Sequence, residues 1–193
     1  MPVTRIDPRS ALVVIDLQRG ILAMPTQVLG DEIVRRVALL ADAFHAGGLP
    51  VIYVHLVNAA DGSDAPPGRV DRAAPMGAQA ADFSELDPRL PRAEGDLVIA
   101  KKQWGAFYGT DLDLQLRRRG ITQLVLAGIS TSIGVETTAR NAWEHGYHVT
   151  IARDAVTDLN AEAEQRSLDL ILPRLAEVDD SAAIIALLPP RSG

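Results

Sequence analysis

The sequence predicts an α/β protein in which a parallel sheet lies between two layers of helices. Short apolar runs, which suit strands buried on both faces, alternate along the chain with segments whose apolar residues recur at helical spacing. Glycine and proline mark the junctions between these segments. Alternation of this kind gives parallel strands joined by right-handed crossovers, so we expect a three-layer, Rossmann-like domain.

In the first half of the chain, residues 11–15 form an uninterrupted apolar run that ends in Asp16. Helical spacing over 33–44 then continues up to a pair of glycines, which supply a helix stop. Further strands are expected at 51–55 and 97–100. No long period survives over 56–95, and such a segment inside a compact domain is typically a functional lid or disordered.

The second half continues the alternation. We expect a helix from Asp111 that Thr110 caps, with Asp113 completing a capping box. The remaining elements are expected at 124–127 (strand), 134–146 (helix), 149–152 (strand, leading to Asp154), about 160–175 (helix) and 182–188, which close the chain. The helix over 134–146 should turn four side chains towards the core: Val135, Thr138, Ala139 and Ala142.

Composition sets limits on function. The 193 residues, 47% hydrophobic and 23% charged, fit a single globular domain over 1–193. A net charge of −6 gives no basic field for nucleic acid, and no apolar run approaches the roughly 18 residues of a membrane span. We therefore expect a cytoplasmic protein that binds neither nucleic acid nor a membrane. The chain has no cysteine, which excludes disulfides and thiolate metal sites.

The polar residues that follow the expected strands define a candidate site. Ligands of open parallel sheets bind beyond the carboxyl ends of the strands. The predicted topology therefore brings Asp16, His55, Lys101 and the loop 128–134 to one edge of the sheet.

Three motifs occur there in a fixed order: Val14-Ile15-Asp16-Leu17-Gln18, Lys101-Lys102-Gln103-Trp104-Gly105-Ala106-Phe107, and the loop and helix over 128–140. This ordered set resembles the isochorismatase-like hydrolases, over nearly the whole chain. The resemblance implies their α/β fold, a small-molecule substrate and a homo-oligomer. Most members carry a reactive cysteine where Gly134 stands here, so the chain is similar to the branch without that thiol, which includes the isochorismatases.

By this resemblance Asp16 is the acid/base carboxylate and Lys101 its cationic partner. Lys101 is preferred to Lys102 because the family's lysine stands five residues before the pair Ala106-Phe107. Burial raises the pKa of a carboxyl group and a nearby ammonium lowers it, which can poise the pair for proton transfer near neutral pH. The alternatives are a capping role for Asp16 and a surface position for Lys101.

The loop that ends at Gly134 is the third part of the candidate site. Thr131, Ser132 and Gly134 stand where a strand turns into a helix, so backbone N–H groups there offer an anion or oxyanion site. The resemblance implies a cis peptide bond between Ile129 and Ser130. It also makes these two residues and Thr131 candidates for substrate binding. The alternative is an ordinary glycine-containing turn. Ser130 or Ser132 is a weak candidate for a replacement nucleophile, because no histidine is placed in the sequence so as to suggest a base for it.

Other residues could line the pocket. Trp104 and Phe107 could wall it around a planar substrate, or pack in the core. Gln18 and His55 are further candidates for substrate binding, and His55 is equally compatible with a core position. Arg69 and Arg72 could hold a substrate carboxylate, or lie exposed.

No metal or other cofactor is expected. Zinc-dependent relatives carry several histidines after the second strand, whereas this chain has His55 alone there. The resemblance thus implies a hydrolase that cleaves a small anionic substrate, a vinyl ether such as isochorismate, with release of pyruvate and Asp16 as general acid. Two alternatives stay open: metal-free hydrolysis of an amide or ester with Asp16 as general base, and a catalytically silent, ligand-binding or oligomeric member.

Overall fold

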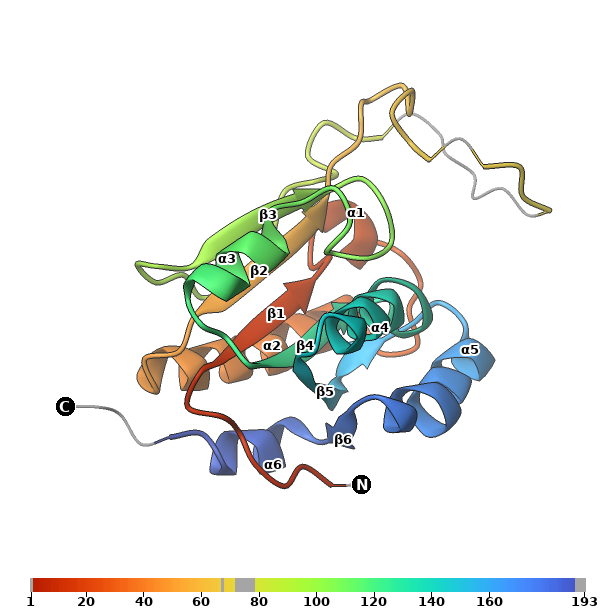
Figure 1. Cartoon of the computed structure of the whole chain (residues 1–193). Coiled ribbons are helices and arrows are strands. Elements are labelled where there is room, and N and C mark those ends of the chain that lie inside the picture. Colours follow the sequence, from red (N-terminus) through yellow and green to blue (C-terminus); the bar gives the residue numbers. More distant parts are fainter. Residues whose placement is uncertain (1, 67, 72–78, 190–193) are drawn as a thin grey trace.

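A six-stranded, all-parallel sheet forms the centre of the computed structural model, which describes residues 2–66, 68–71 and 79–189 (Figure 1). The strand order is β3-β2-β1-β4-β5-β6. The strands are β1 (Ser10–Ile15), β2 (Val51–Leu56), β3 (Leu97–Lys101), β4 (Gln123–Ile129), β5 (His148–Thr157) and β6 (Glu177–Asp179). This is the predicted fold class.

Helices cover both faces of the sheet. They are α1 (Arg19–Leu22), α2 (Gly30–Ala46), α3 (Leu112–Arg118), α4 (Glu136–Glu144), α5 (Ala161–Arg166) and α6 (Ser181–Ala186). Two apolar layers result: α2 and α6 pack on the face that carries Leu12 and Val14, and α3 and α4 on the face that carries Val13 and Ile15. Every residue of β1 is buried, which explains why its sequence shows no polar alternation.

The order of the strands places the site. β1 is paired with β2 on one side and with β4 on the other, so the connections that leave β1 and β4 diverge. A crevice forms at such a switch point, outside the carboxyl ends of the strands. The connection from β2 to β3 also leaves from this end of the sheet, at the upper right of Figure 1.

Several predicted elements need correction. β5 continues to Thr157, beyond the expected end near Asp154, and the short strand β6 was not predicted. The helix expected over 160–175 is broken into α5, a π-helical turn (Ser167–Ile171) and a 3-10 turn (Leu172–Arg174). Proline at position 173 has no N–H to continue an α-helix, which accounts for the tighter turn at its end.

The helix predicted over 134–146 is shorter: α4 covers Glu136–Glu144, and the first two predicted residues belong to a π-helical turn (Thr131–Val135). The four residues predicted to face the core are buried. The capping box before α3 is wrong. Thr110 Oγ1 does accept a hydrogen bond from the N–H of Leu112, at 3.2 Å. The Asp113 carboxylate, however, accepts from the Tyr147 hydroxyl and is not turned back towards Thr110.

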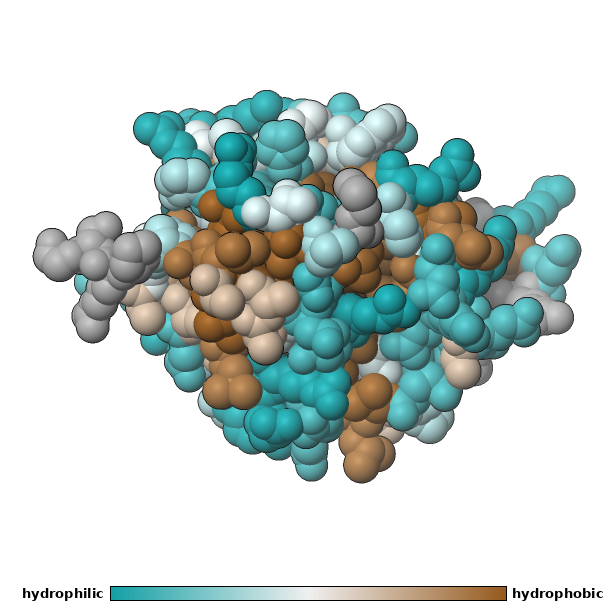
Figure 2. All heavy atoms as spheres, turned by 90° about the horizontal axis from the view of Figure 1, so that it is seen from below, coloured by the Kyte–Doolittle hydropathy of each residue, from teal (hydrophilic) through white to brown (hydrophobic). Residues whose placement is uncertain are grey.

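The side of the molecule that carries α6 and the amino-terminal segment has a mixed surface. Figure 2 shows apolar side chains gathered across the middle of this face, with hydrophilic ones around them. Leu187, which follows α6, is among the exposed large apolar residues. No helix in the described part of the chain combines the length and the apolar character that a bilayer crossing requires.

Candidate functional site

Asp16 stands at the point where β1 ends and adopts an unusual backbone conformation. Its φ is 53°, in the left-handed region that non-glycine residues seldom occupy, although aspartate tolerates it better than most. Its N–H still donates to the Val54 carbonyl at 2.8 Å, as the ladder between β1 and β2 requires. The chain therefore turns sharply at Asp16 while the residue stays attached to the sheet.

Asp16 and Lys101 form a buried ion pair. Lys101 Nζ lies 2.7 Å from Asp16 Oδ2, and the two residues are only 2% and 7% exposed. The ammonium also donates to the Trp104 carbonyl at 2.8 Å, which fixes its direction. Burial raises the pKa of Asp16 to about 6, and the Lys101 ammonium holds it below the value that burial alone would give.

Two glycines, one near the end of β4 and one in the turn after it, allow the backbone to approach this pair. Gly128 has a φ of 120°, and a Cβ there would lie 2.0 Å from the Ile15 carbonyl oxygen, so only glycine fits. At Gly134 a Cβ would lie 3.4 Å from Asp16 Oδ2 and 3.0 Å from Ile15 Cγ2. A side chain at position 134 would therefore contact the Asp16 carboxylate directly.

The turn between β4 and α4 has the cis peptide bond that the resemblance implies, between Ile129 and Ser130. The N–H groups of Ile133 and Val135 both donate to the Ser130 carbonyl, which closes the π-helical turn. The N–H and the hydroxyl of Ser132 both donate to Asp158 Oδ2, at 2.7 Å each. The expectation that the Ser132 amide is free for a substrate anion is therefore wrong.

The sequence did not point to Asp158 or to the acidic residue beside it. Asp158 is 2% exposed and follows directly on β5. Glu164 lies on α5, and its pKa is raised by burial and by the Asp158 carboxylate. The run Ala155-Val156-Thr157 was the available signal, since it continues β5 past Asp154 and makes Asp158 the residue at the strand end. Asp154 instead accepts two hydrogen bonds from Ser181 at the start of α6.

Unpartnered polar atoms gather at this edge. In the described part of the chain five buried side-chain N or O atoms have no hydrogen-bond partner, and four of them follow β1, β2 or β4. These four are Asp16 Oδ1, Asn58 Oδ1, Ser130 Oγ and Thr131 Oγ1. The Thr131 hydroxyl lies near enough to Glu164 to lower the pKa of that carboxyl group, but the two do not meet hydrogen-bond geometry. A buried polar atom without a partner is costly, and native proteins keep few of them outside functional sites.

Gln18 and His55 form hydrogen bonds with backbone groups near Asp16. The Gln18 side chain is fully buried; its amide donates to the carbonyls of Leu56 and Phe83 and accepts from the Leu56 N–H at 2.7 Å. Gln18 therefore ties the end of β2 to the segment that precedes β3. His55 Nδ1 lies 2.7 Å from the Ser84 carbonyl oxygen, and the imidazole is near enough to lower the pKa of Asp16.

The structure does not bring the predicted aromatic wall together. The backbone carbonyl of Trp104 accepts a hydrogen bond from the Lys101 ammonium. Trp104 as a whole is 65% exposed. Phe107 is buried in the α3/α4 layer, where its ring stacks on His145 and lies next to Tyr147. His145 and Tyr147 precede β5, so they lie towards the opposite end of the sheet from Asp16. Arg69 is exposed. Arg72 lies outside the described residues.

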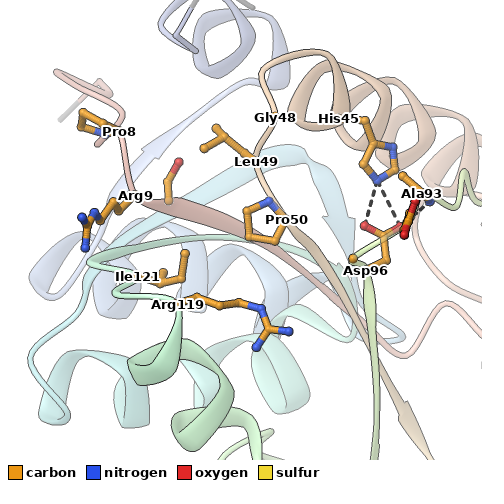
Figure 3. A pocket seen from close by; sticks show the side chains of 13 residues that line it. Pro8, Arg9, His45, Gly48, Leu49, Pro50, Ala93, Asp96, Arg119 and Ile121 are labelled. Atoms are coloured by element: carbon orange, nitrogen blue, oxygen red, sulfur yellow. Dashed lines mark hydrogen bonds and ion pairs between the residues drawn. The ribbon is translucent and has the colours of Figure 1, made fainter. Parts of the chain in front are cut away.

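A separate cavity of about 420 Å³ opens at the amino ends of β1 and β2, away from Asp16 (Figure 3). Its lining includes Arg9, Arg119 and the hydrogen-bonded side chains of His45 and Asp96, whose Nε2 and Oδ1 lie 3.0 Å apart. The two arginine side chains extend away from each other, so they present no common anion site. Over residues 2–66, 68–71 and 79–189, no group of three or more His, Cys, Asp or Glu could hold a metal ion.

Comparison with known proteins gives similar sequences and similar folds. The isochorismatase domain model matches residues 10–183. The chain is 46% identical to the isochorismatase family protein YecD of Escherichia coli O157:H7, over 93% of this chain and 96% of YecD. An isochorismatase family structure from Burkholderia thailandensis superposes with a TM-score of 0.91 at 44% identity, covering 95% of this chain and 97% of that one.

A more distant structure, N-carbamoylsarcosine amidase from Thermoplasma acidophilum, has a TM-score of 0.71 at 27% identity, covering 90% of this chain and 96% of that one. The same fold thus occurs in an enzyme named for amide hydrolysis. With the domain match over 10–183 and the ordered motifs around Asp16, these similarities settle the family. The chain belongs to the isochorismatase family of hydrolases.

Proposed function

We propose that this hydrolase cleaves the vinyl ether of a small anionic molecule such as isochorismate by general-acid catalysis from Asp16, without a covalent enzyme intermediate. One observation carries the proposal. The position that would hold a nucleophile in thiol-dependent relatives is Gly134, and the space beside it leads directly to the Asp16 carboxylate. A reaction at this point therefore has a proton donor and no side-chain nucleophile.

In the proposed reaction the Asp16 proton adds to the terminal methylene carbon of the vinyl ether, and the adjacent carbon becomes an oxocarbenium ion. Water attacks that carbon, and the resulting hemiketal collapses to pyruvate and the ring alcohol. The water supplies the proton that restores Asp16. A carboxyl group with a pKa near 6 is suited to this, because it is partly protonated at neutral pH and still acidic enough to transfer its proton.

The neighbouring residues have separate proposed roles. Lys101 orients Asp16 and lowers the pKa that burial has raised. Ile129, Ser130 and Thr131 bind substrate, with the unpartnered hydroxyls of the last two as hydrogen-bonding groups. Gln18 and His55 position the strand ends around Asp16.

A second candidate is hydrolysis of an amide or ester, favoured by the fold shared with N-carbamoylsarcosine amidase. In this reaction ionised Asp16 acts as general base and activates water, so the required protonation state of Asp16 is the opposite one. The pH dependence of the reaction therefore separates the two candidates.

The direct test is release of pyruvate from isochorismate, followed by a coupled NADH-dependent reductase. Asp16→Asn should lower kcat/KM by about 10²–10⁴-fold, the usual contribution of one general acid. Absence of pyruvate, or near-full activity of Asp16→Asn, contradicts the proposal. Circular dichroism of the variant controls for loss of fold.

We also propose that the chain forms a homo-oligomer, supported by the apolar side chains that gather on the face shown in Figure 2. Sedimentation equilibrium measures this directly, and a monomer at micromolar concentration contradicts it. The cytoplasmic location and the lack of a nucleic-acid partner, of a metal and of any other cofactor stay predictions.

A further inference from the structure

The backbone on both sides of Asn58 is hydrogen-bonded, whereas the amide oxygen of its side chain has no hydrogen-bond partner among the described residues. The backbone on one side is fixed because the Val57 N–H donates to the Lys101 carbonyl at 2.9 Å. On the other side the Ala59 N–H donates to Asp64 Oδ1 at 2.7 Å, and Asp64 forms an ion pair with Lys102. Asn58 is thus fastened on both sides to the end of β3.

This attachment places Asn58 two residues past the end of β2, at the end of β3 that carries Lys101. Leu56 is paired with Lys101, and alternation along β2 puts Ile52 and Val54 on the sheet face that α3 and α4 cover. Carried two residues past β2, the same alternation assigns position 58 to that face. Ile99 also lies on it, and so, two residues later, does Lys101.

The amide oxygen of Asn58 is buried and has no hydrogen-bond partner in the described part of the chain. The residue as a whole is only half-buried. A half-turn about χ2 exchanges the amide oxygen and nitrogen, so Asn58 can offer an acceptor or two donors to the same place. A side chain whose backbone is fixed and whose buried amide oxygen has no hydrogen-bond partner is typical of a preorganised ligand-binding residue.

We propose that Asn58 is a specificity-determining residue that hydrogen-bonds an uncharged polar group of the substrate, a hydroxyl or a carboxamide, next to Lys101. This rests on the proposed function for the location of the reaction, and it adds that the substrate carries such a group besides the scissile bond. Asn58 binds the substrate together with Ser130 and Thr131, whose unpartnered hydroxyls follow β4.

The test compares Asn58→Leu, which keeps the size of the side chain and removes its hydrogen bonds, with Asn58→Asp, which keeps an acceptor and adds a charge. Dissociation constants are measured by calorimetry in the Asp16→Asn background for two probes, isochorismate, which has a ring hydroxyl, and benzamide, which has a carboxamide. Asn160→Ala is the matched control, because Asn160 caps α5 through a hydrogen bond from the Ala163 N–H and lies outside the proposed contacts.

Asn58→Leu should weaken binding of at least one probe by about tenfold or more, which is the usual effect of losing a buried hydrogen bond to a ligand. Its melting temperature should stay equal or rise, because the change removes an unpartnered buried atom. Asn58→Asp should bind benzamide within about threefold of the parent and isochorismate more weakly, since the added charge repels the carboxylates. Asn160→Ala should melt at a lower temperature and bind both probes normally.

Unchanged dissociation constants in Asn58→Leu for both probes overturn the proposal, and so does a parent protein that binds neither probe. A fall in melting temperature with unchanged binding shows a purely structural role and overturns it as well. If Asn58→Leu loses binding while the wild-type enzyme releases no pyruvate from isochorismate, the proposed reaction falls and the role of Asn58 stands. If pyruvate is released and Asn58→Leu binds both probes unaltered, the reaction stands and the role of Asn58 falls.

Discussion

The rate of pyruvate release should fall as the pH rises through about 6, if protonated Asp16 is the acid. Only the pH is varied, and the structure supplies the midpoint of the effect. Asp16 is buried beside Lys101, and the balance of desolvation against the ammonium leaves its pKa at about 6. The dependence of kcat/KM on pH reports the pKa of essential groups in the free enzyme.

The expected profile follows from this midpoint. Below the pKa the acid is protonated and kcat/KM is level; above it the protonated fraction falls about tenfold for each pH unit. At pH 8 kcat/KM should therefore be about one-hundredth of its level value. Lys101→Met removes the ammonium that lowers the pKa of Asp16, so the fall should begin at a higher pH in that variant.

The assay measures kcat/KM between pH 5 and pH 9 with the coupling reductase in excess at every pH and added pyruvate as a control for the coupling step. A rise of kcat/KM through pH 6 would contradict the prediction, because it identifies ionised Asp16 as the active form and supports hydrolysis of an amide or ester. A level profile would show that the titration of Asp16 does not limit the reaction.

The same pKa shift affects stability, with a defined sign. The pKa of Asp16 is 3.8 for an unperturbed group and about 6 in the folded protein, so the folded state holds this proton more tightly than the unfolded state. The contribution is present below the unfolded pKa and is lost as the pH rises through about 6; it amounts to about 3 kcal/mol. Thermal unfolding at several pH values should show this loss in the wild type relative to Asp16→Asn, which cannot titrate there.

Three further predictions concern the glycines and the metal. Gly134→Ala places a methyl group 3.4 Å from Asp16 Oδ2, so kcat/KM should fall by about tenfold with little change in melting temperature, and an unaffected kcat/KM argues against substrate packing on the bare backbone. Gly128→Ala puts a Cβ 2.0 Å from the Ile15 carbonyl oxygen at a φ of 120°, so we expect a loss of about 3 kcal/mol or more in chemical denaturation; near wild-type stability would show that the loop can move. Exhaustive chelation should leave turnover unchanged, and an activity loss that zinc or manganese reverses contradicts the metal-free proposal.

The architecture and the principal residues of the site could be predicted from the amino-acid sequence. Short uninterrupted apolar runs favour strands buried on both faces, and a parallel sheet with helices on both sides buries its strands in this way. The carboxyl ends of such strands meet at one edge, so Asp16 and Lys101 had to lie near each other once their strands were recognised. The ordered set of three motifs that contains them was enough to identify the family.

Which polar groups are already satisfied could be seen only in the folded structure. Periodicity reports that a face is buried, but a hydrogen bond depends on how two distant segments cross. Asp158 accepts the Ser132 N–H because β5 runs five residues further than the apolar pattern over 149–152, and no local signal links positions 26 residues apart. Phe107 turns into the α3/α4 layer for the same kind of reason, since its stacking partner His145 follows α4. Asn58 became visible only when its neighbours were seen bonded and its own amide oxygen was not.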